Sequence, residues 1–331
     1  MRPLARYMRI VNGAARPRFL VARSVSVEVT SSQEGRWEEH ARALERARSI
    51  LDEPSRSEAS PSLMDLKAAM AEPYMRSCSL CPWRCGVDRS SGRPGRCGVA
   101  RPLVASAFTH LGEEALLVPS YTVFFAGCNL RCAFCQNFDL STMPDQGAER
   151  SAEELSRSLD AAAARWIRNI NWVGGDPIPA LPYVLEVLRH LKVGVAQVWN
   201  SNMYLDERAM SLLDGAIDLY LTDLKFGNDA CARRLCGAED YSAVVRRNHL
   251  LAVAQGEVLV RHLQLPGHLE CCTLPLIDWL ADRLPGVAVN LMDQYRPEHR
   301  AHEHPELRAT LSRQEREKAM GHARERGLFL I

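Results

Sequence analysis

The second half of the chain alternates short apolar stretches with amphipathic ones. The apolar stretches lie at 122–128, 169–175, 193–202, 217–225, 258–267 and 287–295. Segments with a helical period lie between them at 152–167, 181–191, 206–214, 242–255 and 273–283, and a last one lies at 312–326. Nearly continuous apolar strands joined by helices predict an α/β fold with a parallel sheet that is covered on both faces. Six such units favour an incomplete (β/α)6 barrel over a doubly wound sheet.

Polar or glycine-rich segments follow the predicted strands. They are Cys128, 174–177, 200–202, 223–225, 262–267 and 290–295. In parallel α/β folds the functional groups lie at the carboxyl ends of the strands. We therefore expect one functional site at this rim of the barrel.

The chain contains eleven cysteines, and seven of them fall between Cys78 and Cys135. No hydrophobic signal sequence precedes them, which makes a disulfide framework the weaker interpretation. The densest pattern is Cys128-Asn-Leu-Arg-Cys132-Ala-Phe-Cys135, directly after a predicted strand. Three thiolates from one loop would bind three irons of a 4Fe–4S cluster and leave the fourth iron open. A zinc site that takes its fourth ligand from elsewhere is the alternative.

This loop resembles the defining C-x3-C-x-aromatic-C loop of the radical S-adenosylmethionine (SAM) superfamily. The resemblance covers about residues 76–296 and is strongest to proteins similar to the pyruvate formate-lyase activating enzyme. Further matching segments are 110–114, 135–137, 169–171, 223–225 and 261–267. The resemblance implies that SAM binds the open iron and is cleaved reductively to methionine and a 5′-deoxyadenosyl radical, which abstracts hydrogen from a substrate. Such a radical requires an enclosed cavity that excludes water.

The resemblance also implies roles for rim residues. The segment 174–177, Gly-Gly-Asp-Pro, looks like the Gly-Gly-Glu-Pro element that receives the SAM ammonium, with Asp in place of Glu. Residues expected to bind SAM are Gly174, Gly175, Asp176, Asn200, Asn202 and Arg261, with Asn200 and Asn202 at the ribose hydroxyls and Arg261 at the carboxylate of SAM. Asp223 and Lys225 are expected to be catalytic. The alternatives are an ordinary β–α turn, unliganded polar strand ends, a strand-end ion pair and a structural salt bridge.

A separate four-thiolate set precedes the barrel. It consists of Cys78, Cys81, Cys85 and Cys97, with glycines and prolines that permit tight turns around a metal. Four thiolates would hold a zinc ion or a second iron–sulfur cluster, and their close spacing on one small loop favours zinc. By contrast, Cys231, Cys236, Cys271 and Cys272 are irregularly spaced, so we interpret them as packing or surface thiols.

The N-terminal region is basic. Residues 1–27 contain no acidic residue, and their arginines are Arg2, Arg6, Arg9, Arg16, Arg18 and Arg23. This composition indicates a mitochondrial transit peptide or, equally, a basic arm or a mis-assigned start. The pattern predicts a helix over 33–53 and a linker over 53–62. The expected domains are a partly disordered extension with one helix (1–75), a four-cysteine metal module (76–105) and the partial barrel (106–331).

Composition and resemblance together limit the partners. The net charge of +1 disfavours a strongly basic nucleic-acid binder, and no apolar run is long enough for a membrane span. We expect a cytoplasmic protein, or one of the mitochondrial matrix if the basic segment is a transit peptide. The resemblance implies a one-electron donor such as flavodoxin or ferredoxin, and a substrate that is either a glycyl radical enzyme-like protein or a small molecule. The alternatives are a non-catalytic iron–sulfur redox sensor and, less favoured, a zinc-stabilised adaptor.

Overall fold

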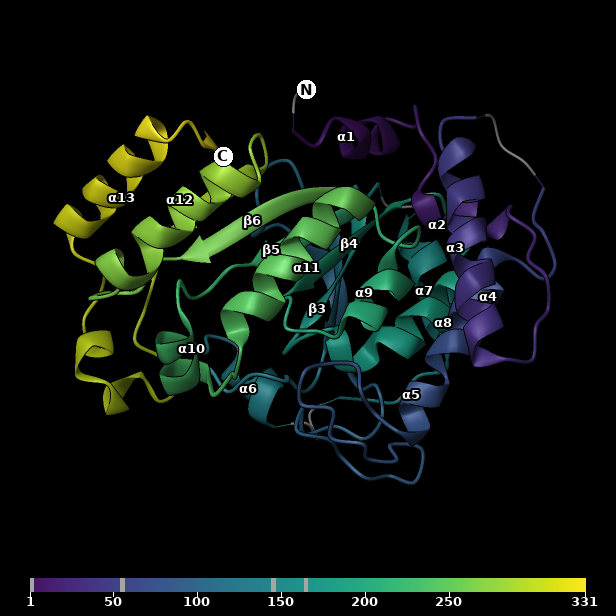
Figure 1. The fold of residues 1–331 in the computed structure, drawn as a ribbon, viewed down its shortest axis with the longest axis horizontal. Coiled ribbons are helices and arrows are strands. Elements are labelled where there is room, and N and C mark those ends of the chain that lie inside the picture. The colour runs from purple at the N-terminus through teal and green to yellow at the C-terminus, as the bar shows by residue number, and fades with distance from the viewer. Residues whose placement is uncertain (1–2, 54–56, 144–146, 164–165) are drawn as a thin grey trace.

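The computed structural model describes residues 3–53, 57–143, 147–163 and 166–331. Within these ranges eight strands form one sheet whose spatial order follows the chain order (Figure 1). Strand β1 is antiparallel to β2, and each later pair of neighbours is parallel. The strands are β1 (Val104–His110), β2 (Ser120–Phe125), β3 (Asn169–Gly174), β4 (Ala196–Ser201), β5 (Leu219–Asp223), β6 (Glu257–Leu263), β7 (Ala288–Met292) and β8 (Phe329–Leu330).

Helices surround this sheet (Figure 1). The N-terminal helices are α1 (Ala5–Val11), α2 (Arg18–Arg23), α3 (Gln33–Ser49), α4 (Leu63–Ala71) and α5 (Pro73–Arg76). The helices of the barrel are α6 (Phe138–Thr142), α7 (Ala152–Ala163), α8 (Leu181–His190), α9 (Glu207–Leu213), α10 (Asp229–Cys236), α11 (Tyr241–Gln255), α12 (Leu274–Arg283) and α13 (Arg313–Glu325). Short 3-10 segments are η2 (Ile178–Ala180), η4 (Ala301–Glu303) and η5 (Pro305–Arg308), and η3 (Leu269–Thr273) is a π-helix.

The predicted fold class is confirmed. Strands β2 to β7 coincide with or overlap the six predicted apolar stretches. Helices α7, α8, α9, α11 and α12 match the predicted amphipathic segments, whereas α6 and α10 were not predicted. Residues 164–165 of the predicted helix 152–167 lie outside the described residues. The sequence did not predict β1, because its edge position leaves alternate residues partly exposed, nor β8, which is two residues long.

The lower half of the barrel interior is apolar and is filled by α1. Leu4, Tyr7 and Ile10 are buried against side chains that point inward from β4 to β7, namely Ala196, Val198, Leu219, Leu221, Leu259 and Ala288. The carboxylate of Glu257, at the start of β6, accepts hydrogen bonds from the backbone N–H groups of Arg6 and Tyr7 at 3.0 and 2.5 Å. Helix α1 therefore covers the end of the barrel from which the strands begin (Figure 1).

The prediction of a single helix over 1–75 is wrong. Five helices lie within the described part of this segment, and α2 and α4 contribute Phe19, Val21, Leu63 and Met64 to the main core. Helices α1, α2, α4 and α5 have four to nine residues, so tertiary packing stabilises them and their sequences show no clear helical period. Helix α4 also begins with a capping box formed by Ser62 and Asp65.

Three arginines of the acid-free segment, Arg6, Arg9 and Arg23, form ion pairs with acidic groups that come later in the chain. Arg6 lies 2.8 Å from Asp52, and Arg23 lies 2.6 Å from Glu58. Arg2 and residues 54–56 of the predicted linker lie outside the described residues. The basic composition of residues 3–25 is therefore accommodated within the fold.

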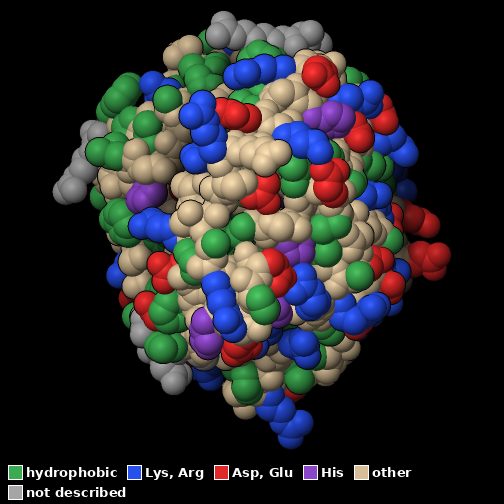
Figure 2. Space-filling view, turned by 90° about the vertical axis from the view of Figure 1, so that its left-hand side faces the viewer, with side chains coloured by type: hydrophobic (Ala, Val, Ile, Leu, Met, Phe, Trp, Pro, Cys, Tyr) green, Lys and Arg blue, Asp and Glu red, His purple; other side chains and the backbone are tan. Residues whose placement is uncertain are grey.

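The face formed by the C-terminal elements, on the left in Figure 1, carries cationic and anionic side chains side by side (Figure 2). Helix α13 is held on α12 by apolar contacts of Ala319 and Ala323 with Ile277. Ion pairs of Arg326 with Asp278 and Asp282 flank this contact. No helix among the described residues is both long and apolar enough to cross a membrane.

Candidate functional site

The loop that follows β2 carries Cys128, Cys132 and Cys135, and we call residues 126–137 the cluster loop. Its backbone is bound on one side to α10, because the N–H groups of Arg131 and Ala133 donate to the carbonyls of Cys236 and Leu235 at 3.0 and 2.7 Å. The Cys128 sulfur accepts from the backbone N–H of Leu130 at 3.4 Å. The Cys135 sulfur lies 3.3 Å from the Ser141 hydroxyl. The fold thus presents three thiols from one loop at the carboxyl ends of the strands, as the sequence predicted.

The three thiols are held as neutral groups. Burial raises the pKa of Cys128 and Cys135, and a hydrogen bond with Cys236, together with burial, raises the pKa of Cys132. Lys225 acts in the opposite direction on Cys132 and Cys135, because its ammonium favours the thiolate. Binding of a metal to these sulfurs must therefore release their protons.

The two glycines after β3 are required by contacts within the protein. A Cβ atom on Gly174 would collide with the backbone of Phe125, and one on Gly175 would collide with the carbonyl of Gly127. Gly174 also has a φ of +135°. The sequence reasoning attributed these glycines to a close approach of SAM. The structure uses them to bring the β3 turn against the cluster loop.

Asp176 joins the β3 turn to the end of β4. Its buried carboxylate accepts hydrogen bonds from the backbone N–H of Asn202 at 2.8 Å and from the hydroxyl of Ser201 at 3.1 Å. It also accepts from the backbone N–H of Ile178 at 3.0 Å. Burial raises the pKa of Asp176 to about 7, although these hydrogen bonds lower it. This carboxylate is therefore engaged by the protein, which does not support the predicted contact with the SAM ammonium.

Asn202 was predicted to hold the ribose of SAM, but its side chain is directed to the cluster loop. Its amide nitrogen donates to the Asn129 side chain at 2.8 Å and lies 3.7 Å from the Cys128 sulfur. Its amide oxygen accepts from the backbone N–H of Tyr204 at 2.8 Å. Asn129 in turn hydrogen-bonds to the Cys81 thiol. Asn202 is thus a positioning residue for the cluster loop.

Arg261 was predicted to bind the SAM carboxylate, but two carboxylates of the protein occupy it. Its Nε and Nη2 atoms donate to the two oxygens of Glu114 at 2.8 and 2.6 Å, and Nη2 also contacts Glu113. Asn290 and Asn171 donate to the same two carboxylates at 2.8 and 3.3 Å. The alternative of a structural salt bridge therefore holds. It also gives a role to Glu113 and Glu114, for which the sequence showed none.

Asp223 and Lys225 meet at the end of β5. The Lys225 ammonium donates to the Asp223 carboxylate at 2.7 Å, and both side chains are partly exposed at the rim. Burial lowers the pKa of Lys225, but the Asp223 carboxylate and the Cys132 sulfur raise it by more. Lys225 therefore stays cationic beside the cluster loop, and the predicted pair is assembled.

The upper half of the barrel interior is polar, unlike the lower half. Asn200 is buried at 7% exposure and, by strand alternation, points inward like Val198. Within the described part of the chain, the Asn171 Oδ1 atom and both amide atoms of Gln264 are buried without a hydrogen-bond partner. Such atoms are satisfied when a ligand or ordered water binds. The polar rim therefore fits a bound polar cofactor, and SAM contact by Asn200 remains a prediction.

The front cysteine module, residues 77–100, packs directly on the cluster loop. The backbone N–H of Cys128 donates to the Cys97 carbonyl at 3.1 Å, and the Trp83 indole donates to the Asn129 carbonyl at 2.8 Å. A Cβ atom on Gly95 would lie 3.1 and 3.6 Å from the sulfurs of Cys85 and Cys97. The two cysteine motifs, separate in sequence, thus form one continuous region.

Sequence reasoning missed a third thiol group. Cys231, Cys271 and Cys272 lie together with His268 beside the first turn of α10, whereas only packing or surface roles were predicted for these cysteines. The segment His268-Leu-Glu-Cys271-Cys272 was the available signal. Cys236, the remaining thiol of that prediction, is buried and donates to the Ala232 carbonyl at 3.1 Å.

Comparisons with known proteins agree with the cluster loop. Residues 122–280 match the family model described as Radical SAM superfamily. Over 99% of both chains, the protein is 39% identical to the uncharacterized protein MJ0674 of Methanocaldococcus jannaschii.

Solved structures with a similar fold were also found. Streptococcus suis SuiB bound to precursor peptide SuiA is 14% identical with a TM-score of 0.45, covering 61% of this chain and 46% of SuiB. The chain thus spans about half the length of SuiB. Methylornithine synthase (PylB) is 13% identical with a TM-score of 0.45, covering 98% of this chain and 77% of that chain. On this family match, residues 122–280 form a domain of the radical SAM superfamily, and the superfamily implies a 4Fe–4S cluster and SAM as cofactors.

Proposed function

We propose that Cys128, Cys132 and Cys135 bind a 4Fe–4S cluster that reduces SAM and so starts a radical reaction on a substrate at the same rim. The observation that carries this proposal is the set of three thiols on one loop, beside a polar rim with unpartnered buried atoms. When bound, the cluster and SAM supply the reducing electron and the radical. The rest of the machinery consists of side chains of this chain.

The protein residues position the loop and balance its charge. Asn202 and Asn129 fix the peptide next to Cys128 through their 2.8 Å hydrogen bond. Lys225 places a cation beside Cys132, which offsets the negative charge of thiolate ligands. Helix α1 covers the opposite end of the barrel and excludes water from that side.

The finer assignment rests on resemblance and on the Asp223–Lys225 pair. We assign the protein to the activating-enzyme-like oxidoreductases, in which hydrogen is abstracted from a glycyl radical enzyme-like protein or from a small molecule. A flavodoxin or ferredoxin would supply the electron. Asp223 and Lys225 line the rim next to the cluster loop and are our candidates for contact with the reacting groups. The front module would hold zinc or a second cluster and brace the cluster loop through the Cys97 carbonyl.

The test is anaerobic reconstitution with iron and sulfide, followed by dithionite and SAM, with 5′-deoxyadenosine measured by chromatography. We expect the nucleoside from the wild-type protein and none from Cys132→Ala. Because the Cys236 thiol contacts Cys132, Cys236→Ala is the matched variant, and we expect it to retain cluster iron and SAM binding. A reduced cluster that binds no SAM would instead identify a redox sensor and overturn the proposal.

A further inference from the structure

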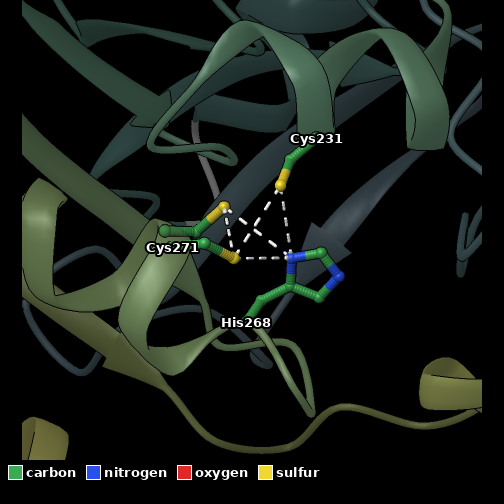
Figure 3. Close-up of side chains that lie close together, drawn as sticks. Cys231, His268 and Cys271 are labelled. Atoms are coloured by element: carbon green, nitrogen blue, oxygen red, sulfur yellow. Dashed lines mark hydrogen bonds between the residues drawn. The ribbon is translucent and has the colours of Figure 1, made fainter.

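Four metal-ligating side chains meet at the first turn of α10, whereas the cluster loop contacts its last turn. They are Cys231, His268, Cys271 and Cys272, which we call the Cys3His group, and their ligand atoms all lie within 4.8 Å of one another. Among the described residues, this is the one group of three or more such side chains found at that spacing. Figure 3 shows the sulfurs and the imidazole pointing toward a common centre.

Five of the six distances among these atoms match the edges of a small tetrahedron, and the sixth, between the Cys231 and Cys272 sulfurs, is at most 4.8 Å. The His268 Nδ1 atom lies 3.5, 3.3 and 3.8 Å from the sulfurs of Cys231, Cys271 and Cys272. The Cys271 sulfur lies 3.8 Å from that of Cys231 and 3.9 Å from that of Cys272. Zinc bonds to sulfur and nitrogen in tetrahedral geometry require edges of about 3.8 Å between sulfurs and about 3.6 Å between nitrogen and sulfur.

Local structure holds the two halves of the group together. Cys231 lies in the first turn of α10, where the Asn228 side chain accepts from its backbone N–H at 2.8 Å. The same Asn228 side chain donates to the Cys271 carbonyl at 2.8 Å. Cys271 and Cys272 lie in the π-helix η3, an irregular helix type that is frequent at functional sites. Gly227 approaches so closely that a Cβ atom there would lie 2.7 Å from the Cys272 Cα atom.

Groups outside the tetrahedron fit a bound cation. The His268 Nε2 atom, which faces away from the sulfurs, lies 3.6 Å from the Glu306 carboxylate and 3.2 Å from Arg234. A metal on Nδ1 leaves the ring proton on Nε2, which faces the Glu306 carboxylate at 3.6 Å. The Arg234 guanidinium can only donate, so it must then turn from Nε2 to its ion-pair partner Glu306. The positive charge of Arg234 lies next to a site that would become negative when the three thiols ionise.

We infer that the Cys3His group is a structural zinc site. Binding of Zn²⁺ replaces the protons of three thiols, which pass to solvent, so that three thiolates, one neutral imidazole and the ion carry a net charge of −1. A single ion fits better than an iron–sulfur cluster, because cluster thiolates bind different irons and lie farther apart. The zinc joins the first turn of α10 to the segment after β6. Since the last turn of α10 accepts the backbone N–H groups of the cluster loop, the site braces that loop.

The first test measures zinc per chain by elemental analysis of the full-length protein. We expect Cys231→Ser/Cys271→Ser to contain about one zinc ion less than the wild type, whichever metal the front module holds. Cys236→Ser is the matched control, because Cys236 lies on the same helix outside the group, and its zinc content should equal that of the wild type. Equal zinc in the double variant and the wild type overturns the inference.

The second test needs no variant and so does not depend on the folding of one. Cys271 is exposed, so an unliganded thiol there is accessible to iodoacetamide. We expect site-resolved mass spectrometry of the wild-type protein to show that Cys271 is alkylated slowly until a zinc chelator is added, and faster by at least tenfold afterwards. Adding ZnCl2 back should restore protection. A rate that the chelator does not change, or a disulfide at Cys271, contradicts a zinc site.

Discussion

Asp218 is a buried carboxylate near the closed end of the barrel, and it makes stability depend on pH. It accepts backbone hydrogen bonds from Gln197 and Arg18, each at 2.8 Å. Burial nevertheless raises the pKa of Asp218 from 3.8 to about 6. Between these values the folded state binds more protons than the unfolded state, so the free energy of unfolding falls as pH rises from about 4 to about 6.

We expect this residue to lower stability by about 3 kcal/mol over that pH interval. Asp218→Asn removes the titration, so the stability difference between variant and wild type should shift in favour of the variant as pH rises, and level off above pH 6. Urea unfolding of both proteins across the interval measures this difference. A constant difference would mean that Asp218 is ionised throughout.

Asn202 offers a second residue-level test. Asn202→Ala leaves the buried Asn129 oxygen and the Tyr204 N–H without their partners, and we expect a loss of about 1–3 kcal/mol in stability. The cluster loop should also release iron faster during gel filtration. Ser211→Ala, on the outer helix α9, is the control and should change neither quantity. If Asn202→Ala kept its iron and lost only SAM affinity, the ribose role would be the correct one.

Single residues show where sequence reasoning ends. Cys128, Cys132 and Cys135 could be proposed as ligands of one cluster because they are close together in the sequence. The partner of Arg261 could not, because Glu114 lies 147 positions away and a guanidinium binds either a protein carboxylate or a ligand carboxylate. Gly174 and Gly175 were identified as significant, but the backbone they approach was not. The sequence therefore indicated which residues are important by their chemical type, but it did not indicate which groups they contact in the fold.

Helix α1 is the element with the clearest testable role. Tyr7 is fully buried, and its hydroxyl accepts from Asn169 at 2.8 Å. We expect Tyr7→Ala to lower the free energy of unfolding by about 3–5 kcal/mol, because it leaves a cavity in the barrel interior. Tyr7→Phe keeps the ring and should cost about 1–2 kcal/mol. Chemical denaturation of the three proteins measures both, and equal stabilities would show that α1 does not support the barrel.

Strands β2 to β7 and the longer helices of the barrel could be predicted, as could α3, while most of the short helices could not. Strands β2 to β7 lie in nearly continuous apolar stretches, and this pattern can be recognised in the sequence without knowing which strands are neighbours. Helices α1, α2 and α10 have six to eight residues, too few for a period to stand out. Their positions depend on cores that only the assembled chain creates. The arginine-rich segment was for this reason interpreted as an extension.

At the scale of the whole molecule, one core links the regions that the sequence divided into three. The main apolar cluster includes Phe19, Leu80 and Leu307, from the N-terminal helices, the front module and the C-terminal segment. We expect a single unfolding transition, with circular dichroism and tryptophan fluorescence coinciding. Trp37, Trp83 and Trp199 report on the three regions. Two separated transitions would restore the division into independent domains.

The position of α1 in the barrel interior, at the end where the strands begin, has a kinetic consequence for the proposed chemistry. Because α1 blocks the end of the barrel at which the strands begin, reactants and products reach and leave the cluster loop from the side of the rim. The reactant that binds nearest the cluster loop must therefore bind first, and its products must leave last. If SAM binds the cluster iron, the substrate binds after SAM, and its product leaves before methionine and 5′-deoxyadenosine are released. Binding would then follow a fixed order. Steady-state kinetics would show it, because the last product released would inhibit competitively toward SAM and not toward the substrate.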